Sequence, residues 1–239
     1  MLEDDEVARA LFVMAHPDDV DFGCAGTVAT WVDAGIEVTY LLVTDGDAGG
    51  FDPDVPRSEI AGIRRAEQTA AAKEVGVTDL HFLGYPDGRL TVTLELRRDI
   101  ARVIRQVRPD RVVTQSPERN YQRIFASHPD HLAAGEATLC AVYPDARNPF
   151  TFPELVQDEG LDAWTVRETW LSASPTPNRW VDITDNLERK LAALRCHESQ
   201  LPDADGTMER MRQWARANAA AGGLAEGRGA EAFFVIETG

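Results

Sequence analysis

The 239-residue chain is poor in positive charge and in cysteine. It contains 24 lysines and arginines and 40 aspartates and glutamates, which gives a formal net charge of −16. Because a nucleic-acid partner requires a cluster of basic side chains, this balance argues against one. The three cysteines, Cys24, Cys140 and Cys196, are scattered, so their spacing indicates neither a disulfide framework nor a zinc ribbon. They are typical of a reducing compartment.

Apolar runs long enough to cross a membrane are absent as well. The chain begins Met-Leu-Glu-Asp-Asp-Glu, which lacks the basic start and the apolar middle of a signal peptide. No apolar run approaches the ~20 residues that a membrane-spanning helix needs. We therefore expect a soluble, cytoplasmic protein with no membrane partner, and the sequence leaves a homo-oligomer open.

Several catalytic motifs are missing. The chain has no Gly-x-Ser-x-Gly segment, which carries the nucleophile of many hydrolases, and no Walker A loop. The first apolar segment is not followed by Gly-x-Gly-x-x-Gly, since Gly23 and Gly26 lie inside a helical pattern instead. Nucleotide-dependent chemistry therefore loses its best support.

Short apolar segments alternate with helical patterns through the first two thirds of the chain. The apolar segments are residues 10–15, 37–44, 80–83 and 111–115, and the helical patterns cover about 22–34, 58–75 and 94–107. Such alternation predicts an α/β, Rossmann-like fold with a mostly parallel sheet and helices on both faces. Ligands bind to such sheets beyond the carboxyl ends of the strands, so we expect the functional site there.

The C-terminal third, about residues 150–239, has a less regular pattern. It predicts strands at 170–173, 180–183 and 233–236 and helices at about 186–198 and 208–221. No linker is strong enough to divide the chain, so we expect a single domain over residues 1–239. We interpret Trp170, Trp180 and Trp214 as packing residues, because large aromatic side chains carry much of any core.

Two His-Pro-Asp segments carry the strongest chemical signal. Ala15-His16-Pro17-Asp18-Asp19 directly follows the first apolar segment, and His128-Pro129-Asp130-His131 follows a polar loop after the fourth. If the two segments meet in the fold, they form a divided metal site. His16, Asp19 and His131 are the candidate ligands, and two histidines with one carboxylate and an open position suit one catalytic zinc ion per chain. The same set also serves Fe(II) or another divalent ion.

The remaining side chains of the two segments suit hydrolysis. Asp18 is left free beside the metal, where it can accept a proton from the attacking water. His128 would act across the site as a general acid or would stabilise the oxyanion. Asp130 would orient a ligand histidine from behind, as metal sites usually require.

Each of these segments also has a structural interpretation. Asp18 or Asp19 can serve as the N-cap of the following helix, and a His-x-x-His pair at a helix start is often a surface or capping feature. We interpret His81 as structural, because it lies within an apolar segment. His197, at the end of a helical pattern, is either a cap favoured by the helix dipole or a substrate contact.

The chain resembles the PIG-L or LmbE-like N-deacetylases, zinc enzymes that remove acyl groups from amino sugars and related glycoconjugates. The resemblance spans nearly the whole chain, and the two His-Pro-Asp segments in this order are its most specific part. The other matching residues are Thr44-Asp45-Gly46 with Gly49, Arg64-Arg65-Ala66-Glu67, Gly76, Leu83-Gly84, Pro86-Asp87-Gly88, Lys190, His197-Glu198-Ser199-Gln200 and Glu231-Ala232-Phe233.

This resemblance implies the same ligands, with Asp18 as the base and His128 as its acid or electrostatic partner. It further implies that Arg64 faces the sugar or its leaving group, and we add Asp45, Asp87 and His197 as substrate-binding residues. The chain departs from the family pattern at two positions. Val20 replaces a common Glu that is not a ligand. Ala126 stands where some sugar deacetylases have a Tyr that donates to the oxyanion, a role that would pass to a group such as Tyr121.

The predicted function is therefore zinc-dependent hydrolysis of an N-acyl amide, above all an N-acetyl amide, on an amino-sugar glycoconjugate or related small molecule. One alternative is a metal-dependent phosphoesterase, for which Arg119 and Arg123 are the cations near the motifs. Another is a sugar-binding protein with a non-catalytic metal. The open coordination position and the free Asp18 argue against the latter, because structural zinc sites are closed by protein ligands.

Overall fold

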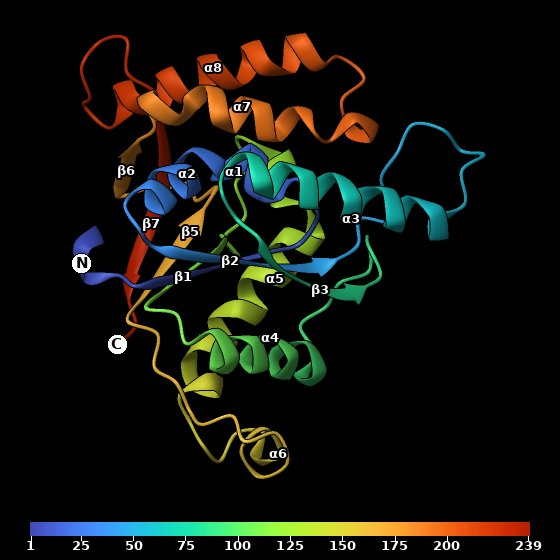
Figure 1. Cartoon of the computed structure of the whole chain (residues 1–239), viewed down its shortest axis with the longest axis vertical. Coiled ribbons are helices and arrows are strands. Elements are labelled where there is room, and N and C mark those ends of the chain that lie inside the picture. The colour runs from blue at the N-terminus through green and yellow to red at the C-terminus, as the bar shows by residue number, and fades with distance from the viewer.

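The computed structural model describes residues 1–239 and contains one mixed sheet of seven strands with helices around it (Figure 1). The strands are β1 Arg9–Met14, β2 Glu37–Thr44, β3 Asp79–Tyr85, β4 Arg111–Gln115, β5 Glu168–Ser172, β6 Arg179–Asp182 and β7 Ala230–Glu237. The helices are α1 Asp19–Gly23, α2 Ala25–Asp33, α3 Arg57–Glu74, α4 Leu94–Val107, α5 Pro129–Cys140, α6 Pro153–Gln157, α7 Leu187–Arg195 and α8 Ala204–Ala221.

The sheet is mostly parallel, with strand order β3-β2-β1-β4-β5-β7-β6. β1 to β5 pair in parallel, and β7 pairs antiparallel with β5 and with β6. The predicted α/β fold is therefore confirmed. The three strands predicted in the C-terminal third are present as β5, β6 and β7, and all of them join this sheet.

The two faces of the sheet carry separate apolar cores, because successive strand residues point to opposite sides. In β1, Phe12 and Met14 pack into one core with Trp31 of α2, while Leu11 and Val13 pack into the other. Figure 1 shows α2, α3 and α7 over one face, with α8 outside α7, and α4 and α5 over the other. β1 is thus covered on both sides, which explains its uninterrupted apolar sequence.

The helix expected over residues 22–34 begins earlier and is divided at Cys24, which corrects that prediction. The carboxylate of Glu231 accepts hydrogen bonds from the backbone N–H groups of Gly26, at 3.1 Å, and Thr27, at 2.7 Å. A distant residue therefore caps the N-terminus of α2, and the buried ammonium of Lys190 lies 2.5 Å from the same carboxylate. This tertiary cap is invisible to a local helix pattern.

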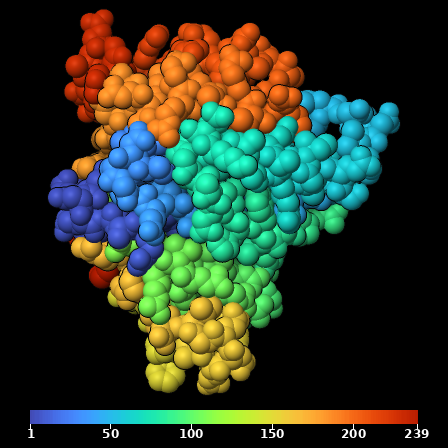
Figure 2. All heavy atoms as spheres, in the orientation of Figure 1, coloured from blue at the N-terminus to red at the C-terminus, as the bar shows by residue number.

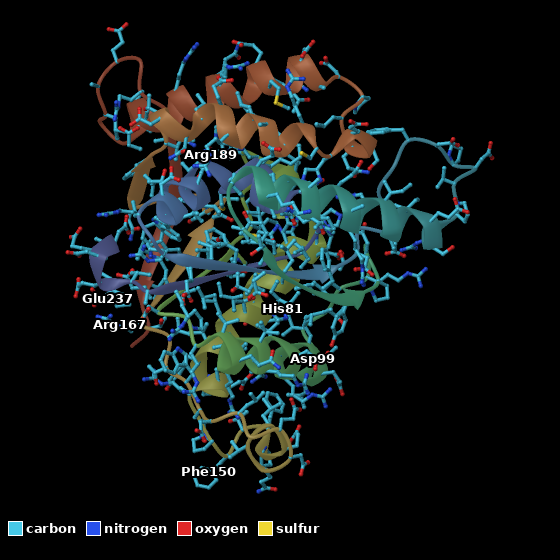
Figure 3. The ribbon with its side chains drawn as sticks, viewed as in Figure 1. His81, Asp99, Phe150, Arg167, Arg189 and Glu237 are labelled. Atoms are coloured by element: carbon cyan, nitrogen blue, oxygen red, sulfur yellow. The ribbon has the colours of Figure 1, made fainter.

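The segment around α6 projects from the end of the molecule opposite α8 (Figure 1). Figure 2 shows it as a yellow lobe below the sheet, and Figure 3 places Phe150 at its tip. The Phe150 side chain is 88% exposed. Figure 3 also places Arg167 and Glu237 near the two chain termini, where the N-terminal ammonium lies 2.7 Å from Glu237. None of the helices combines the length and the hydrophobicity needed to cross a bilayer.

The order in which strands are added to the sheet reverses beside β1, and the site lies at this point. From β1 the chain builds outward through β2 and β3, and then returns to place β4 on the other side of β1. The loops after β1 and β4 therefore leave the sheet in opposite directions and open a crevice at its carboxyl edge. The first His-Pro-Asp segment follows β1, and the loop after β4 leads to the second.

Candidate active site

Three side chains from the two segments converge at this crevice. Nδ1 of His16 lies 3.3 Å from Oδ2 of Asp19 and 3.3 Å from Nε2 of His131. Nε2 of His131 lies 3.1 Å from Oδ1 of Asp19. Ligand positions of a tetrahedral site with metal–ligand bonds of about 2.0–2.1 Å lie about 3.3–3.4 Å apart. The 3.3 Å between the two imidazole nitrogens fits two such positions, and each nitrogen lies within 3.3 Å of one of the two oxygens of Asp19. We call His16, Asp19 and His131 the ligand cluster.

The hydrogen bonds behind the two histidines favour the tautomers that a metal needs. Nε2 of His16 lies 3.0 Å from Asp87 and 3.3 Å from Asp130, so its proton is held there and the Nδ1 lone pair faces the ligand cluster. Nδ1 of His131 lies 3.3 Å from the carbonyl oxygen of Ala126, which leaves the Nε2 lone pair free. Such outer partners orient ligand histidines in metal sites. Asp130 contacts His16 on the side away from the ligand cluster, and Asp87 shares this contact.

The carboxylates around His16 favour a positive charge at the ligand cluster. Burial lowers the pKa of His16, but hydrogen bonds to the three surrounding carboxylates outweigh it and raise that pKa to about 12. Two further groups bring donor atoms within 4.8 Å of one another: His16, His128 and His131, and His16, Asp87 and Asp130. The backbone N–H groups of Gly88 and Leu90 already donate to Asp130, which favours its role as an outer partner rather than a ligand. The donor set of the ligand cluster fits a divalent metal.

Asp18 lies beside the cluster with a left-handed backbone, at φ 97°. Few residues other than glycine adopt this conformation, and such strain is often found at functional sites. It turns neighbouring carboxylates in different directions: Asp19 into the cluster and Asp18 toward Arg64, whose Nη2 donates to Oδ2 at 2.9 Å. The Asp18 side chain makes no capping hydrogen bond, so the N-cap interpretation fails for it. Burial raises its pKa to about 6 although Arg64 acts to lower it.

His128 begins α5 and faces both ligand histidines. Its Nδ1 accepts a hydrogen bond of 3.2 Å from the backbone N–H of Asp130, which satisfies the capping interpretation. Its ring centroid lies 5.0 Å from that of His16 and 5.3 Å from that of His131. Burial and the two neighbouring imidazoles lower the pKa of His128. With Nδ1 accepting, the proton of the neutral ring is on Nε2.

A polar cleft of about 400 Å³ opens over the ligand cluster. Arg64 and Asp87 line it, although Arg64 is buried and also donates to the carbonyl oxygen of Pro17. Asp45 does not line the cleft, because it forms two 2.7 Å hydrogen bonds with Arg65. The other residues of the lining are His16, Asp18, Asp19, Phe22, Ala48, Gly49, Gly88, Phe125, His128, His131 and Gln200.

His197 is fully buried and does not reach the cleft. Its Nε2 lies 2.8 Å from Asp21, to which Gln68 also donates at 2.8 Å. The other end of Gln68 accepts a hydrogen bond of 2.8 Å from the backbone N–H of Asp18. This geometry favours a positioning role for His197 over the substrate contact that we expected. Gln68, which sequence reasoning missed, lies four residues after Arg64 and therefore on the same face of α3.

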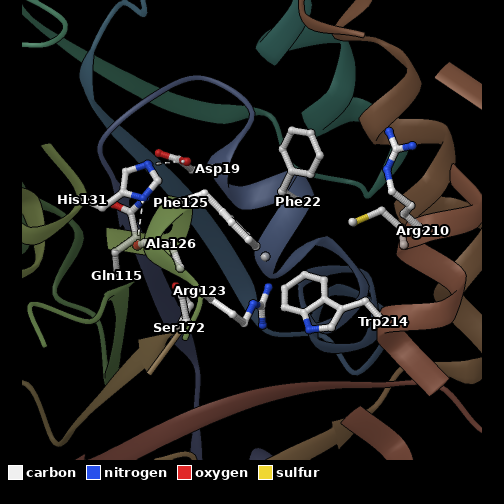
Figure 4. Close-up of a pocket in the computed structure, with 13 residues that line it drawn as sticks. Asp19, Phe22, Gln115, Arg123, Phe125, Ala126, His131, Ser172, Arg210 and Trp214 are labelled. Carbon is white, nitrogen blue, oxygen red and sulfur yellow. Dashed lines mark hydrogen bonds and ion pairs between the residues drawn. The ribbon is translucent and has the colours of Figure 1, made fainter. Parts of the chain in front are cut away.

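A second, apolar cavity of about 550 Å³ adjoins the cleft and shares Asp19, Phe22, Phe125 and His131 with it. Figure 4 shows Asp19 and His131 on one side of this cavity and Trp214 on the other. Trp214 therefore lines a cavity, which corrects its assignment as a packing residue, whereas Trp170 is buried in the core as expected. Tyr121 is 83% exposed and lines neither space, so it is not positioned as an oxyanion donor.

Comparison with known proteins agrees with this arrangement. A family model described as "PIG-L: GlcNAc-PI de-N-acetylase" matches residues 11–142. The chain is 37% identical to a diacetylchitobiose deacetylase of Thermococcus kodakarensis, over 83% of this chain and 72% of that protein. It is 30% identical to a probable N-acetyl-alpha-D-glucosaminyl L-malate deacetylase 2 of Bacillus anthracis, over 80% of this chain and 81% of that protein.

A solved structure extends the similarity to the whole fold. The N,N'-diacetylchitobiose deacetylase of Pyrococcus horikoshii superposes with a TM-score of 0.89 at 32% identity, covering 98% of this chain and 85% of that one. The fold and the site therefore define an α/β hydrolytic centre of the de-N-acetylase class. The chain belongs to the PIG-L family.

Proposed function

We propose that the protein is a deacetylase that hydrolyses the N-acetyl amide of an amino-sugar derivative with one zinc ion held by His16, Asp19 and His131. The observation that carries this proposal is the convergence of the three side chains of the ligand cluster beside a carboxylate, Asp18, that is not needed as a ligand. Two imidazole nitrogens and one carboxylate oxygen suit zinc, and Fe(II) accepts the same set. When bound, such an ion supplies a Lewis acid that polarises the carbonyl and acidifies water.

Asp18 is the proposed general base. Its carboxylate accepts a proton from the water that attacks the amide carbonyl, and Arg64 holds the second carboxylate oxygen in place. As the C–N bond breaks, the proton passes from Asp18 to the leaving nitrogen, and the products are acetate and a free amine. Gln68 supports this geometry because it holds the backbone of Asp18 in its left-handed conformation.

His128 is the proposed donor to the oxyanion. Because Nδ1 accepts from the backbone N–H of Asp130, the neutral ring presents Nε2–H as a donor. The lowered pKa of His128 keeps the ring neutral near pH 7, which favours hydrogen-bond donation over general-acid catalysis. His128 would also replace the tyrosine donor that is missing at Ala126, since Tyr121 lines neither cavity.

The polar cleft supports an amino-sugar substrate. Arg64, Asp87 and Gln200 offer donors and acceptors for hydroxyl groups beside the ligand cluster. The names of the relatives describe deacetylation of N-acetylglucosamine derivatives, such as diacetylchitobiose and a glucosaminyl malate. We extend that substrate class to this chain. A cytoplasmic location, a single-domain organisation and a homo-oligomer stay predictions from the sequence. The sugar contacts predicted for Asp45 and His197 are not part of this proposal, because neither residue lines the cleft.

The other two functions lack a supporting observation. For a phosphoesterase, Arg119 is exposed, and Arg123 lies in the apolar cavity rather than in the polar cleft. A non-catalytic sugar-binding protein does not need a carboxylate, that of Asp18, held in a left-handed conformation beside the ligands and facing the cleft. No observation in the structure favours either function over amide hydrolysis.

The proposal is tested by incubating the purified protein separately with methyl N-acetylglucosaminide and with 4-nitrophenyl phosphate. We expect equal amounts of acetate and free amine from the first and almost no phosphate from the second. Asp18→Asn is the matched control, because it keeps the side-chain volume and removes the base. Phosphate release without acetate, lost in His16→Ala, would establish the phosphoesterase instead.

A further inference from the structure

The size and the apolar lining of the second cavity are not needed for deacetylation of a simple sugar. Its lining contains Phe22, Phe125, Met211 and Trp214, and it reaches the ligand cluster through Asp19 and His131. An acetyl group adds only one methyl beyond the carbonyl, which leaves most of about 550 Å³ for another part of the substrate. Because apolar pockets with a few polar groups are typical ligand sites, this cavity is suited to a large apolar group.

One cation lies in this cavity without a polar partner. The guanidinium of Arg123 lies 5.2 Å from the ring centre of Phe125 and 4.7 Å from that of Trp214, and it makes no hydrogen bond or ion pair. Figure 4 shows it beside the indole of Trp214. Arginine has five N–H donors, and these rings carry no strong acceptor. The donors of Arg123 are therefore available to a ligand.

The surroundings of Arg123 offer its guanidinium no acidic partner. The chain has 40 acidic residues against 24 basic ones, yet none of its carboxylates pairs with Arg123. Burial lowers the pKa of Arg123, and no neighbouring carboxylate acts to raise it. Arg210, the other arginine of the cavity, is exposed and already pairs with Asp203 and Thr207. Arg123 is thus the cation that a ligand can reach.

We propose that the apolar cavity binds the aglycone of the substrate, and that this aglycone is an aromatic or other flat apolar group with a carboxylate. The carboxylate pairs with Arg123, and the apolar body lies against Phe125 and Trp214. A planar guanidinium matches a carboxylate in two parallel hydrogen bonds, which favours a carboxylate over an uncharged group. This inference rests on the proposed function, because it takes the acyl group to be acetyl.

The aglycone is the part of the substrate that can reach the cavity. In a 2-acetamido sugar, the glycosidic carbon is bonded to the carbon that carries the amide nitrogen. With the amide at the ligand cluster and the hydroxyl groups in the polar cleft, the aglycone leaves the sugar next to the cluster. The cavity opens at that point, because it shares Asp19 and His131 with the cleft.

Three glycosides of N-acetylglucosamine test this assignment: the methyl, phenyl and 4-carboxyphenyl glycosides. We expect kcat/KM for acetate release to rise about fivefold from methyl to phenyl, through contact with the rings. A further rise of roughly tenfold is expected for 4-carboxyphenyl, through the ion pair with Arg123. The gains should appear mainly in KM, because the added groups are remote from the reacting amide.

Variants separate the contributions of the two groups. Arg123→Gln should lower the ratio of the 4-carboxyphenyl rate to the phenyl rate about tenfold, and Trp214→Ala should lower the ratio of phenyl to methyl. Arg119→Gln is the matched control, since it removes the same charge from an exposed position of the same loop. It should leave both ratios unchanged.

The inference fails if the 4-carboxyphenyl glycoside is no better than the phenyl glycoside, or if its advantage persists in Arg123→Gln. It also fails if N-octanoylglucosamine is preferred to N-acetylglucosamine and Trp214→Ala removes that preference, because the cavity then holds the acyl chain. Calorimetry of the same glycosides with Asp18→Asn measures their relative affinities without turnover. Absence of acetate from the methyl glycoside therefore contradicts the proposed function, whereas equal binding of the three glycosides contradicts this inference.

Discussion

Arg64 donates a 2.9 Å hydrogen bond from Nη2 to Oδ2 of Asp18. The same guanidinium contacts the carbonyl oxygens of Pro17 and Gly46, so it joins the loops after β1 and β2. It also lines the polar cleft. This relationship makes Arg64 the group that holds the proposed base, in addition to the sugar contact that the family resemblance implies.

Replacing Arg64 with Lys separates these two roles. Lysine keeps the positive charge but cannot contact Asp18 and two carbonyl oxygens with one planar group. We expect kcat for N-acetylglucosaminide hydrolysis to fall about 10- to 100-fold, with a smaller change in KM, because Asp18 loses its orientation. Steady-state kinetics measures the two constants. A raised KM with kcat unchanged would instead assign Arg64 to sugar binding alone.

Removing a member of the ligand cluster should remove the metal. We expect about one zinc ion per chain in the unaltered protein. The zinc content should be far lower in each of the variants His16→Ala, Asp19→Ala and His131→Ala, because the two remaining donors bind zinc weakly. Elemental analysis after dialysis measures the content. His81→Ala is the control, since His81 is on β3 and lies 3.4 Å from Asp79 rather than in the cluster. Full metal content in His131→Ala would exclude that residue as a ligand.

The central fold was predictable because its signals are local. Periodicity gave β2, β4 and α4 at their observed bounds, since buried parallel strands and an amphipathic helix leave direct patterns. The two His-Pro-Asp segments indicated a shared site because the carboxyl ends of parallel strands meet at one edge. The break at Cys24 was missed, because it depends on Glu231, more than two hundred residues further along the chain.

The outer parts of the site depend on packing that no local pattern encodes. His197 meets Asp21 only because α7 packs against α1 and α2. Trp214 lines the cavity because α8 places its indole 4.7 Å from the guanidinium of Arg123, which lies far from it in the sequence. Arg64 and Gln68 were closer to being predictable, because a spacing of four residues places both on one face of α3.

The proposed role of His128 predicts a kinetic effect without loss of metal. His128→Ala should lower kcat about 100-fold, the usual scale for one oxyanion donor, while zinc content stays unchanged. His128→Asn, which restores an N–H donor, should recover part of the rate. Unchanged kcat in His128→Ala would transfer oxyanion stabilisation to another group.

The buried pair of His197 and Asp21 predicts a pH-dependent stability. Burial lowers the pKa of His197, but the hydrogen bond and charge of Asp21 outweigh it, and the net shift is upward. The folded protein therefore binds this proton more tightly than the unfolded chain, in which the pKa is about 6.5. The stabilisation is complete below about pH 6.5 and is lost as the pH rises through the folded-state value.

His197→Gln measures this contribution. The variant should lose about 3 kcal/mol of unfolding free energy near pH 6, because it leaves Asp21 without its charged partner. The difference from the unaltered protein should shrink across a pH series that runs upward from about 6.5, as measured by urea unfolding. His81→Gln, a substitution of the same type on β3, should follow the unaltered protein at every pH. A constant difference across this range would show that the pair is not titrating.

The central claim is metal-dependent hydrolysis of an N-acetyl amide on an amino sugar. It is tested most directly by the acetate released from N,N'-diacetylchitobiose by one protein sample before chelation, after chelation, and after one equivalent of zinc is returned. The account predicts release, loss of release together with the metal, and recovery with zinc. Acetate release that continues after the metal has been removed, or its absence with one zinc ion bound per chain, would contradict the account.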